Sequence, residues 1–211
     1  MVKLRYLGNA CVEIIDNSAH LIIDPAYEFE PEDGIDTILL THEHDDHLDI
    51  DIIKKFLEKN EYNIEIYGPK SIKKKLESLD LDEQLHIIED QDEFKTGIFK
   101  IRAFKLECYK TKSCLGYLIK KDEIAVLHTA DSSEFSKRLK RLRNSVDYCF
   151  IACFKEKYED YLRFIQDISP KVTFPYHFTS NETESAKELA EYLKEYGFES
   201  KYIEPGTEFE Y

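Results

Sequence analysis

The sequence predicts one mixed domain over residues 1–211, of the α/β or α+β class, with two β-sheets flanked by helices. Three observations predict it. Short runs rich in Val, Ile, Leu and Tyr open the chain, and helical spacing alternates with strand-like runs after them. No repeat or Gly/Ser/Pro-rich linker divides the sequence. Its 211 residues are 42% hydrophobic, which is enough for a substantial core.

The first 40 residues are expected to form strands that lead to a histidine-rich segment. Apolar runs predict these strands at Leu4–Leu7, Cys11–Ile15, Leu21–Ile23 and Asp36–Leu40. Asp24-Pro25 interrupts the pattern after the third run. The fourth run leads into His42–His47, and the spacing of apolar residues over Asp49–Lys59 then predicts a helix.

The rest of the chain mixes both kinds of element. Helices are expected at Ser71–Leu79 with a Ser cap, Glu134–Leu142, Tyr158–Ile168 and Thr183–Tyr196. Strands are expected at Ile64–Tyr67, Gly116–Ile119, Ile124–His128, Asp147–Ile151, Lys171–Phe174 and Lys201–Ile203, with two or three more between His86 and Ala103.

Charge and composition narrow the range of partners. The net charge of −14 disfavours a nucleic-acid partner. The basic stretch Lys137–Arg143 has helical apolar spacing and is interpreted as a solvated helix face. No signal peptide and no apolar run near the roughly 20 residues of a membrane span is present, so we expect a cytoplasmic protein. Five cysteines without CxxC spacing argue against a disulfide framework, and most are expected to be small buried residues.

The segment His42-Glu43-His44-Asp45-Asp46-His47 carries the chemistry. It holds three of the seven histidines and follows a predicted buried strand. In extended backbone, His42 and His44 point to the same side and make a ready pair of metal ligands. Asp46 and His47 could serve a second ion. The alternative, in which Asp45 or Asp46 only caps the next helix, does not explain the imidazole pair.

These residues resemble a known superfamily. The stretch His42-x-His44-x-Asp46-His47 after a hydrophobic strand resembles the signature of metallo-β-lactamase-fold hydrolases. Leu21–Pro25 resembles their Ile-Asp-Pro turn, and Leu127–Ser132 resembles their strand that ends in Gly-Asp-Thr. The later segments Pro170-Lys171 and Pro175–Phe178 resemble the Pro-x-His segment of the branch that includes ascorbate-6-phosphate lactonase.

The resemblance implies a four-layer αββα sandwich with a metal site at one edge of the sheets. It implies that His42 and His44 bind a first ion, that Asp46, His47 and His177 bind a second, and that Asp131 bridges both. One or two Zn²⁺ ions are expected, with Mn²⁺ or Fe as alternatives, and Asp46 and Asp131 are the expected catalytic residues.

The later histidines and Asp131 have plainer interpretations when the resemblance is set aside. Asp131 could equally cap a helix before Glu134, and His177 could be a loop residue. We expect His128 to face the interior or support the site. His20 and His86 lie in polar neighbourhoods and are expected at the surface.

The sequence departs from the family pattern at two places. The family supplies a third histidine to the first metal, but this chain has none between His86 and His128. Cys108 or Glu107 lies near that position, and either could bind Zn²⁺; the alternative is a buried Cys108 and a solvated Glu107. Ala130 replaces the usual glycine, which matters if the backbone there needs a positive φ.

The expected function is hydrolysis of a small-molecule ester, lactone or phosphodiester by water that a metal activates. The loops Ala26–Gly34 and Phe154–Asp160 would set its specificity. Three rivals stay open: a nuclease of the same fold, a di-iron site that reduces oxygen or nitric oxide, and a non-catalytic metal-binding protein. His44 stands where the di-iron proteins carry Glu. A homo-oligomer is also left open.

Overall fold

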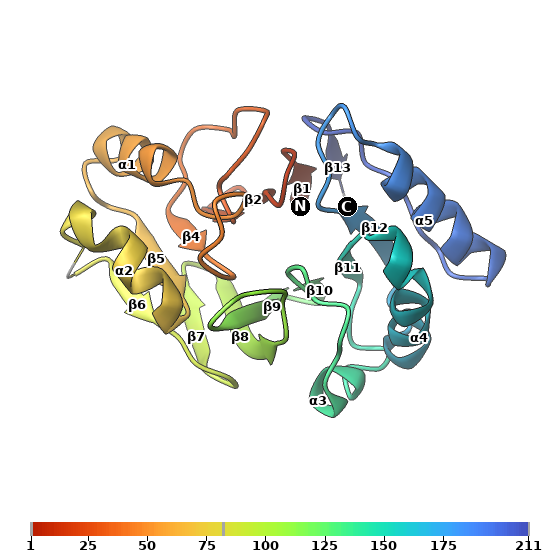
Figure 1. Ribbon diagram of the computed structural model, residues 1–211. Helices are drawn as coiled ribbons and strands as arrows, with labels where there is room; N and C mark the ends of the chain where they lie inside the picture. The colour runs from red at the N-terminus through yellow and green to blue at the C-terminus, as the bar shows by residue number, and fades with distance from the viewer. Residues whose placement is uncertain (1, 82, 211) are drawn as a thin grey trace.

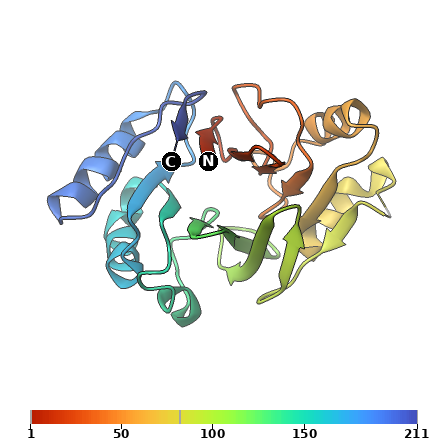
Figure 2. The same ribbon diagram turned by 180° about the vertical axis from the view of Figure 1, so that it is seen from behind.

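Two β-sheets pack face to face, with helices on the outer side of each. The computed structural model describes residues 2–81 and 83–210. Figures 1 and 2 show α1 and α2 outside one sheet and α3, α4 and α5 outside the other. The four layers confirm the expected αββα sandwich.

The first sheet has strand order β13-β1-β2-β3-β4-β5-β6. Its strands are β1 (Lys3–Tyr6), β2 (Val12–Asp16), β3 (Ala19–Ile23), β4 (Thr37–Leu39), β5 (Glu65–Gly68), β6 (Leu85–Ile87) and β13 (Glu208–Glu210). The pairs from β3 to β6 are parallel. Parallel neighbours need crossover connections. The connection from β4 to β5 contains α1 (Ile50–Lys59), that from β5 to β6 contains α2 (Lys73–Leu76), and that from β3 to β4 is a loop.

The second sheet has strand order β12-β11-β10-β9-β8-β7. Its strands are β7 (Glu93–Thr96), β8 (Phe99–Leu106), β9 (Cys114–Lys121), β10 (Ile124–His128), β11 (Tyr148–Ala152) and β12 (Val172–Tyr176). The covering helices are α3 (Lys137–Lys140), α4 (Tyr158–Ile168) and α5 (Glu184–Glu195).

The alternation of side chains along a strand divides the apolar residues between two cores. In β3, Leu21 and Ile23 face the core between the sheets. Ile22 points the other way and packs in a cluster with residues of α1 such as Ile53 and Leu57. Every residue of β3 is buried, as a strand covered on both faces requires.

The carboxyl ends of strands from both sheets meet at one edge. Asp24 follows β3, Asp131 follows β10, and His177 follows β12, while the segment from Thr41 follows β4. Because parallel strands end on the same side of a sheet, these residues come together although the chain separates them widely.

Three predicted elements differ in the structure. Lys201–Ile203 is not a strand; β13 at Glu208–Glu210 takes the edge beside β1, and Ser200 makes only an isolated bridge to Thr173. The helix predicted at Glu134–Leu142 is reduced to α3, which Ser136 caps. Ser71 caps no helix, because a 3₁₀ turn that begins at Lys70 precedes α2.

His20 is buried, not at the surface as expected. Its Nε2 lies 2.6 Å from Glu13 Oε1, and Arg5 pairs with the same glutamate from the neighbouring strand. The loop that follows β3 covers this group, and the backbone N–H of Glu32 donates to Glu13 Oε1 at 2.8 Å. A buried carboxylate needs such partners. His86 is half-exposed and pairs with Glu65.

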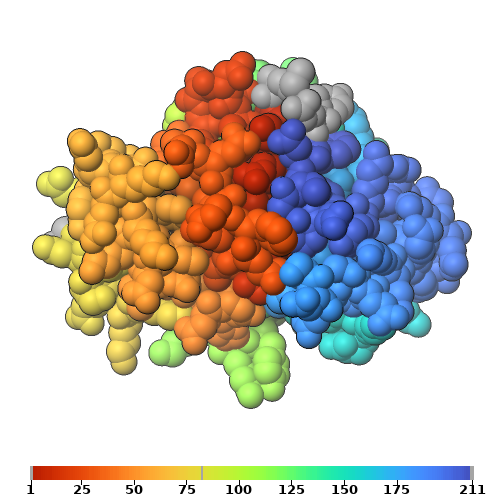
Figure 3. Space-filling view, turned by 90° about the horizontal axis from the view of Figure 1, so that it is seen from above, coloured from red at the N-terminus to blue at the C-terminus, as the bar shows by residue number. Residues whose placement is uncertain are grey.

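The two ends of the described chain lie side by side, since β13 pairs with β1. Figure 3 shows the N-terminal part of the surface, in red and orange, against the C-terminal part, in blue. No helix among the described residues has the length and apolar character that crossing a membrane requires.

Candidate metal centre

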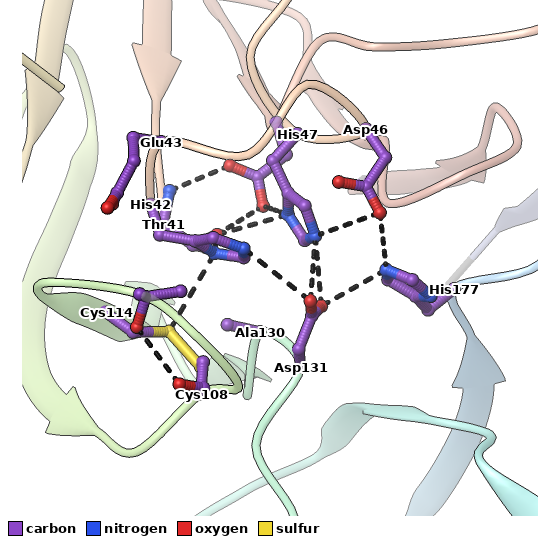
Figure 4. A network of polar contacts seen from close by, with 12 residues as sticks. Thr41, His42, Glu43, Asp46, His47, Cys108, Cys114, Ala130, Asp131 and His177 are labelled. Carbon is purple, nitrogen blue, oxygen red and sulfur yellow. Dashed lines mark hydrogen bonds and ion pairs between the residues drawn. A yellow bond between two sulfur atoms is a disulfide. The ribbon is translucent and has the colours of Figure 1, made fainter.

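Three side chains from both sheets converge in the buried part of the site (Figure 4). His47 Nε2 lies 3.0 Å and 3.1 Å from the two carboxylate oxygens of Asp131. His42 Nε2 lies 3.6 Å from Asp131 Oδ2. The side chains of His42 and His47 have no exposed surface, while that of Asp131 is 12% exposed. Their nitrogen and oxygen atoms are close enough to hold one metal ion.

A second group shares His47 and lies nearer the surface. It comprises Asp46, His47 and His177. His177 Nε2 is 3.4 Å from Asp46 Oδ2 and 3.3 Å from Asp131 Oδ1. Asp131, a member of the first group, thus also contacts the second. The structure therefore brings together five of the seven predicted ligands.

His44 and Cys108 lie outside both groups. The ring of His44 packs edge-on against that of His42, with their centroids 4.6 Å apart. Cys108 forms a disulfide with Cys114 and so presents no thiolate in this structure. The ligand roles of His44 and of a reduced Cys108 stay predictions. Glu107, the other candidate, has an exposed side chain 3.8 Å from Lys105.

The sequence argued against a disulfide framework, and the structure contains one disulfide, between Cys108 and Cys114. The hairpin of β8 and β9 aligns Leu106 with Cys114, so Cys108 in the connecting loop lies with its Cα only 6.1 Å from that of Cys114. Cys114 Sγ also lies 3.9 Å from His42 Nδ1. The other three cysteines, Cys11, Cys149 and Cys153, are free and buried as expected.

Asp24 orients the ligands of the buried group. Its carboxylate accepts hydrogen bonds from the backbone N–H of Thr41 at 2.7 Å, from Thr41 Oγ1 at 2.6 Å and from His47 Nδ1 at 2.7 Å. Thr41 Oγ1 lies 2.9 Å from His42 Nδ1. Because the hydroxyl hydrogen goes to Asp24, that oxygen can accept from His42 Nδ1–H. Both histidines are then fixed with Nε2 toward Asp131.

Sequence reasoning assigned Asp24 only to a turn and gave Thr41 no role. The available signal was their placement, since Asp24 ends a buried strand and Thr41 directly precedes the first histidine. Asp24 has no exposed surface, and a buried carboxylate needs polar partners. The pattern of strands in the sequence does not identify those partners.

Burial and neighbouring charges set the pKa values in the metal-free site. Burial lowers the pKa of His42 to about 4, so His42 is neutral at pH 7. Burial also opposes the charging of His47, but the carboxylates of Asp24 and Asp131 outweigh it and raise its pKa to about 10. The bond to His177 lowers the pKa of Asp46 to about 2. The pKa of Asp131 lies well below its usual range because His47, above all, outweighs the effect of burial.

Three residues at this edge have left-handed backbone. Asp24, Ala130 and His177 have φ values of +48°, +46° and +68°. The position of Ala130 is thus one that favours glycine, as the comparison with the family pattern suggested. Such backbone strain persists only where surrounding contacts enforce it, which is typical of functional sites.

The residues present suit a divalent metal ion. His42 Nε2 is fully buried and has no hydrogen-bond partner, an arrangement that costs free energy unless a ligand is bound. Imidazole and carboxylate are ligands of Zn²⁺, and also of Mn²⁺ and Fe. Asp49, not Asp45 or Asp46, caps α1 through bonds to the N–H groups of Asp51 and Ile52. Capping therefore does not account for Asp46.

Comparison with known proteins agrees with this geometry. The family model described as "Beta-lactamase superfamily domain" matches residues 5–194. This chain belongs to the β-lactamase superfamily. A UPF0173 protein of Pyrococcus furiosus is 30% identical over 187 residues, which are 84% of this chain and 83% of that protein. A protein of Sulfolobus acidocaldarius named "UPF0173 metal-dependent hydrolase" is 37% identical over 57 residues, 23% of this chain and 25% of that protein.

A solved structure shares the fold over nearly the whole chain. The metallo-β-lactamase fold protein YhfI of Bacillus subtilis superposes with a TM-score of 0.82 at 16% identity, over 99% of this chain and 98% of that chain. The fold and superfamily expected from the resemblance are confirmed. The branch that includes ascorbate-6-phosphate lactonase stays a prediction.

Proposed function

We propose that this protein of the β-lactamase superfamily is a metal-dependent hydrolase that cleaves an ester, lactone or phosphodiester of a small molecule. The convergence of His42, His47 and Asp131, joined by Asp46 and His177, carries the proposal. A divalent ion held by these side chains would lower the pKa of a bound water toward neutrality and polarise the oxygen of the bond to be cleaved.

The chain's own residues have distinct tasks in this proposal. Asp24 and Thr41 hold the two buried imidazoles so that Nε2 of each faces Asp131. Asp131 is anionic, belongs to the buried group and contacts His177 of the second group, so it can bind at both. The side chain of Asp46 is 50% exposed and anionic at neutral pH, and it can accept the proton of the attacking water.

The metal requirement is tested first by elemental analysis of protein from zinc-supplemented culture. We expect one or two equivalents of metal in the wild type and a loss of at least half in Asp131→Asn and His47→Ala. Asp36→Asn is a suitable control, because Asp36 lies at the opposite end of β3 and β4 from the site. Its carboxylate accepts hydrogen bonds from the backbone N–H of His20 and from the hydroxyl of Thr37. Metal-free wild-type protein would contradict the proposal.

Catalysis is tested next with a panel of esters, lactones and phosphodiesters. Replacement of Asp46 by Asn should lower the rate on any substrate of the wild type by about 10²-fold or more, the usual size of an acid–base contribution. The non-catalytic alternative predicts that the metal binds but that no member of the panel is hydrolysed, and that Asp46→Asn changes no rate.

A further inference from the structure

A cavity of about 500 Å³ opens beside the candidate metal centre and contains Asp131 in its lining. Its walls come from three segments, the β8–β9 loop, the loop after β10 and the start of the loop after β11. Behind Asp131, the fully buried His42 directs an unpartnered Nε2 at the same carboxylate. The reacting bond of a substrate can therefore lie at this end while the remainder fills the cavity.

The walls of the cavity carry more negative than positive charge. Glu107, Glu134 and Glu156 line it, with Lys157 as the only cation in the lining. Lys157 is 3.9 Å from Asp160, so part of its charge is offset. Glu134 and Glu156 have no ion-pair partner in the described part of the chain, whereas Glu107 lies 3.8 Å from Lys105.

The backbone places two of these carboxylates side by side. Glu107 and Glu134 face each other in an antiparallel bridge. Like charges directly opposite each other in such a pair are destabilising. A cation in the cavity would relieve this repulsion, and an anion would increase it.

Aromatic rings lie close to the same carboxylates. Phe154 lines the cavity, with its ring 5.2 Å from the ring of His177. Tyr109 on the β8–β9 loop also lines the cavity, and its side chain is highly exposed, at 76%. Aromatic faces next to carboxylates suit an organic cation, because the ring quadrupole attracts positive charge. Lys110 Nζ already lies 4.8 Å from the centre of the Tyr109 ring, so a ligand cation would replace Lys110 on that face or use the ring of Phe154.

We propose that this cavity selects small esters or lactones that carry a positively charged group, such as a substituted ammonium, away from the reacting carbonyl. This inference rests on the proposed hydrolase function and names its substrate class.

The test uses three p-nitrophenyl esters with acyl groups of similar size and different charge. Their acyl groups are 4-(trimethylammonio)butanoyl, the neutral 5,5-dimethylhexanoyl and the anionic glutaryl. With metal-loaded wild type we expect kcat/KM to fall in that order, by about tenfold between the cation and the neutral ester, the effect of two or three partly screened charges.

Matched variants separate the local effect from that of total charge. Glu134→Gln combined with Glu156→Gln should bring the cation-to-neutral ratio of kcat/KM close to one. The control combines Glu77→Gln with Glu123→Gln, which changes the net charge equally at exposed positions, in a 3₁₀ turn beside α2 and in the β9–β10 turn at the opposite end of β10 from Asp131. It should keep the wild-type ratio.

A binding measurement distinguishes failure of this inference from failure of the hydrolase proposal. Calorimetry compares 4-(trimethylammonio)butanoate with 5,5-dimethylhexanoate on the same metal-loaded proteins. Hydrolysis of all three esters without discrimination, or a preference for glutaryl, would overturn the inference and leave the hydrolase proposal intact. Absence of hydrolysis together with a binding preference lost only in the Glu134/Glu156 variant would support the cavity assignment and count against the hydrolase proposal.

Discussion

At the scale of single residues, Asp24 shows how a side chain outside the ligand groups determines their geometry. Three hydrogen bonds reach its buried carboxylate, two of them from Thr41 and one from His47. Partners of this kind fix the orientation of a ligating imidazole and increase its basicity. A change at Asp24 should therefore alter the affinity for metal although Asp24 itself is not in either ligand group.

Asp24→Asn keeps the shape of the side chain but removes its charge. We expect the dissociation constant for Zn²⁺ to rise by about 10- to 100-fold, the usual cost of losing such a partner. Competition with a fluorescent chelator measures it, with Asp36→Asn as the control that retains wild-type affinity. Unchanged affinity in Asp24→Asn would show that the bond to His47 does not matter for binding.

Ala130 gives a second prediction at this scale. Its φ of +46° favours glycine, whereas Ala103, equally buried, lies within β8. Replacing Ala103 by Gly should lower the free energy of unfolding by about 1 kcal/mol. Ala130→Gly should cost much less, since relief of backbone strain offsets the loss of the methyl group. Equal losses in chemical denaturation of the two variants would contradict the strain argument.

At the scale of elements, the β8–β9 hairpin brings a disulfide to the edge of the site. The remaining thiols are buried within or next to β2 and β11, and burial raises the pKa of Cys153 to about 11 and that of Cys11 well above its usual value. Thiolate, the reactive form, is therefore scarce in the folded protein at pH 8.

Thiol titration follows directly from this arrangement. The native protein should show almost no reactive thiol. The denatured protein should show three without reductant, for Cys11, Cys149 and Cys153, and five after reduction. Five thiols without reductant would mean that the Cys108–Cys114 bond is absent from the purified protein.

Elements with strong local patterns were predictable from sequence. Tyr158–Ile168 was predicted with the bounds of α4 because its apolar residues repeat with helical spacing and form one buried face. The last strand was not, because β13 depends on pairing with β1 at the far end of the chain. The ligand cluster was foreseeable from its residue types. The role of Asp24 was not, because its partner His47 is 23 residues away. The contact of Cys114 with His42 was not either, because 72 residues separate the two.

At the scale of the whole molecule, protonation links metal binding to pH. In the metal-free protein, the raised pKa of His47 stabilises the fold fully below pH 6.5, and this contribution is lost as the pH rises through about 10. The lowered pKa of Asp46 acts oppositely, because its contribution is present above about pH 3.8 and is lost as the pH falls through about 2. The lowered pKa of His42 acts in the same direction as that of Asp46 but at higher pH, because its contribution is present above pH 6.5 and is lost as the pH falls through about 4. The metal-free protein should therefore be most stable near pH 6.5 on account of these three groups.

Bound metal should offset the loss of stability that the metal-free protein shows above pH 6.5. A bound ion needs neutral His47, so binding between pH 6.5 and 10 releases one proton from it. The apparent affinity should then rise by up to about tenfold per pH unit in this range. Thermal unfolding with and without Zn²⁺ should show a difference in midpoint that grows from pH 6.5 to 9. A constant difference would contradict the assignment of His47 as a ligand.

The candidate ligands belong to both halves of the sandwich, since His42, Asp46 and His47 follow a strand of the first sheet and Asp131 and His177 follow strands of the second. An ion bound among them would act as a cross-link between segments as far apart as residues 42 and 177. Such a link exists only in the folded chain, so free metal at 1,000 times its dissociation constant would add about 4 kcal/mol to the free energy of unfolding. Metal supply would then control how long the protein survives as well as how fast it works.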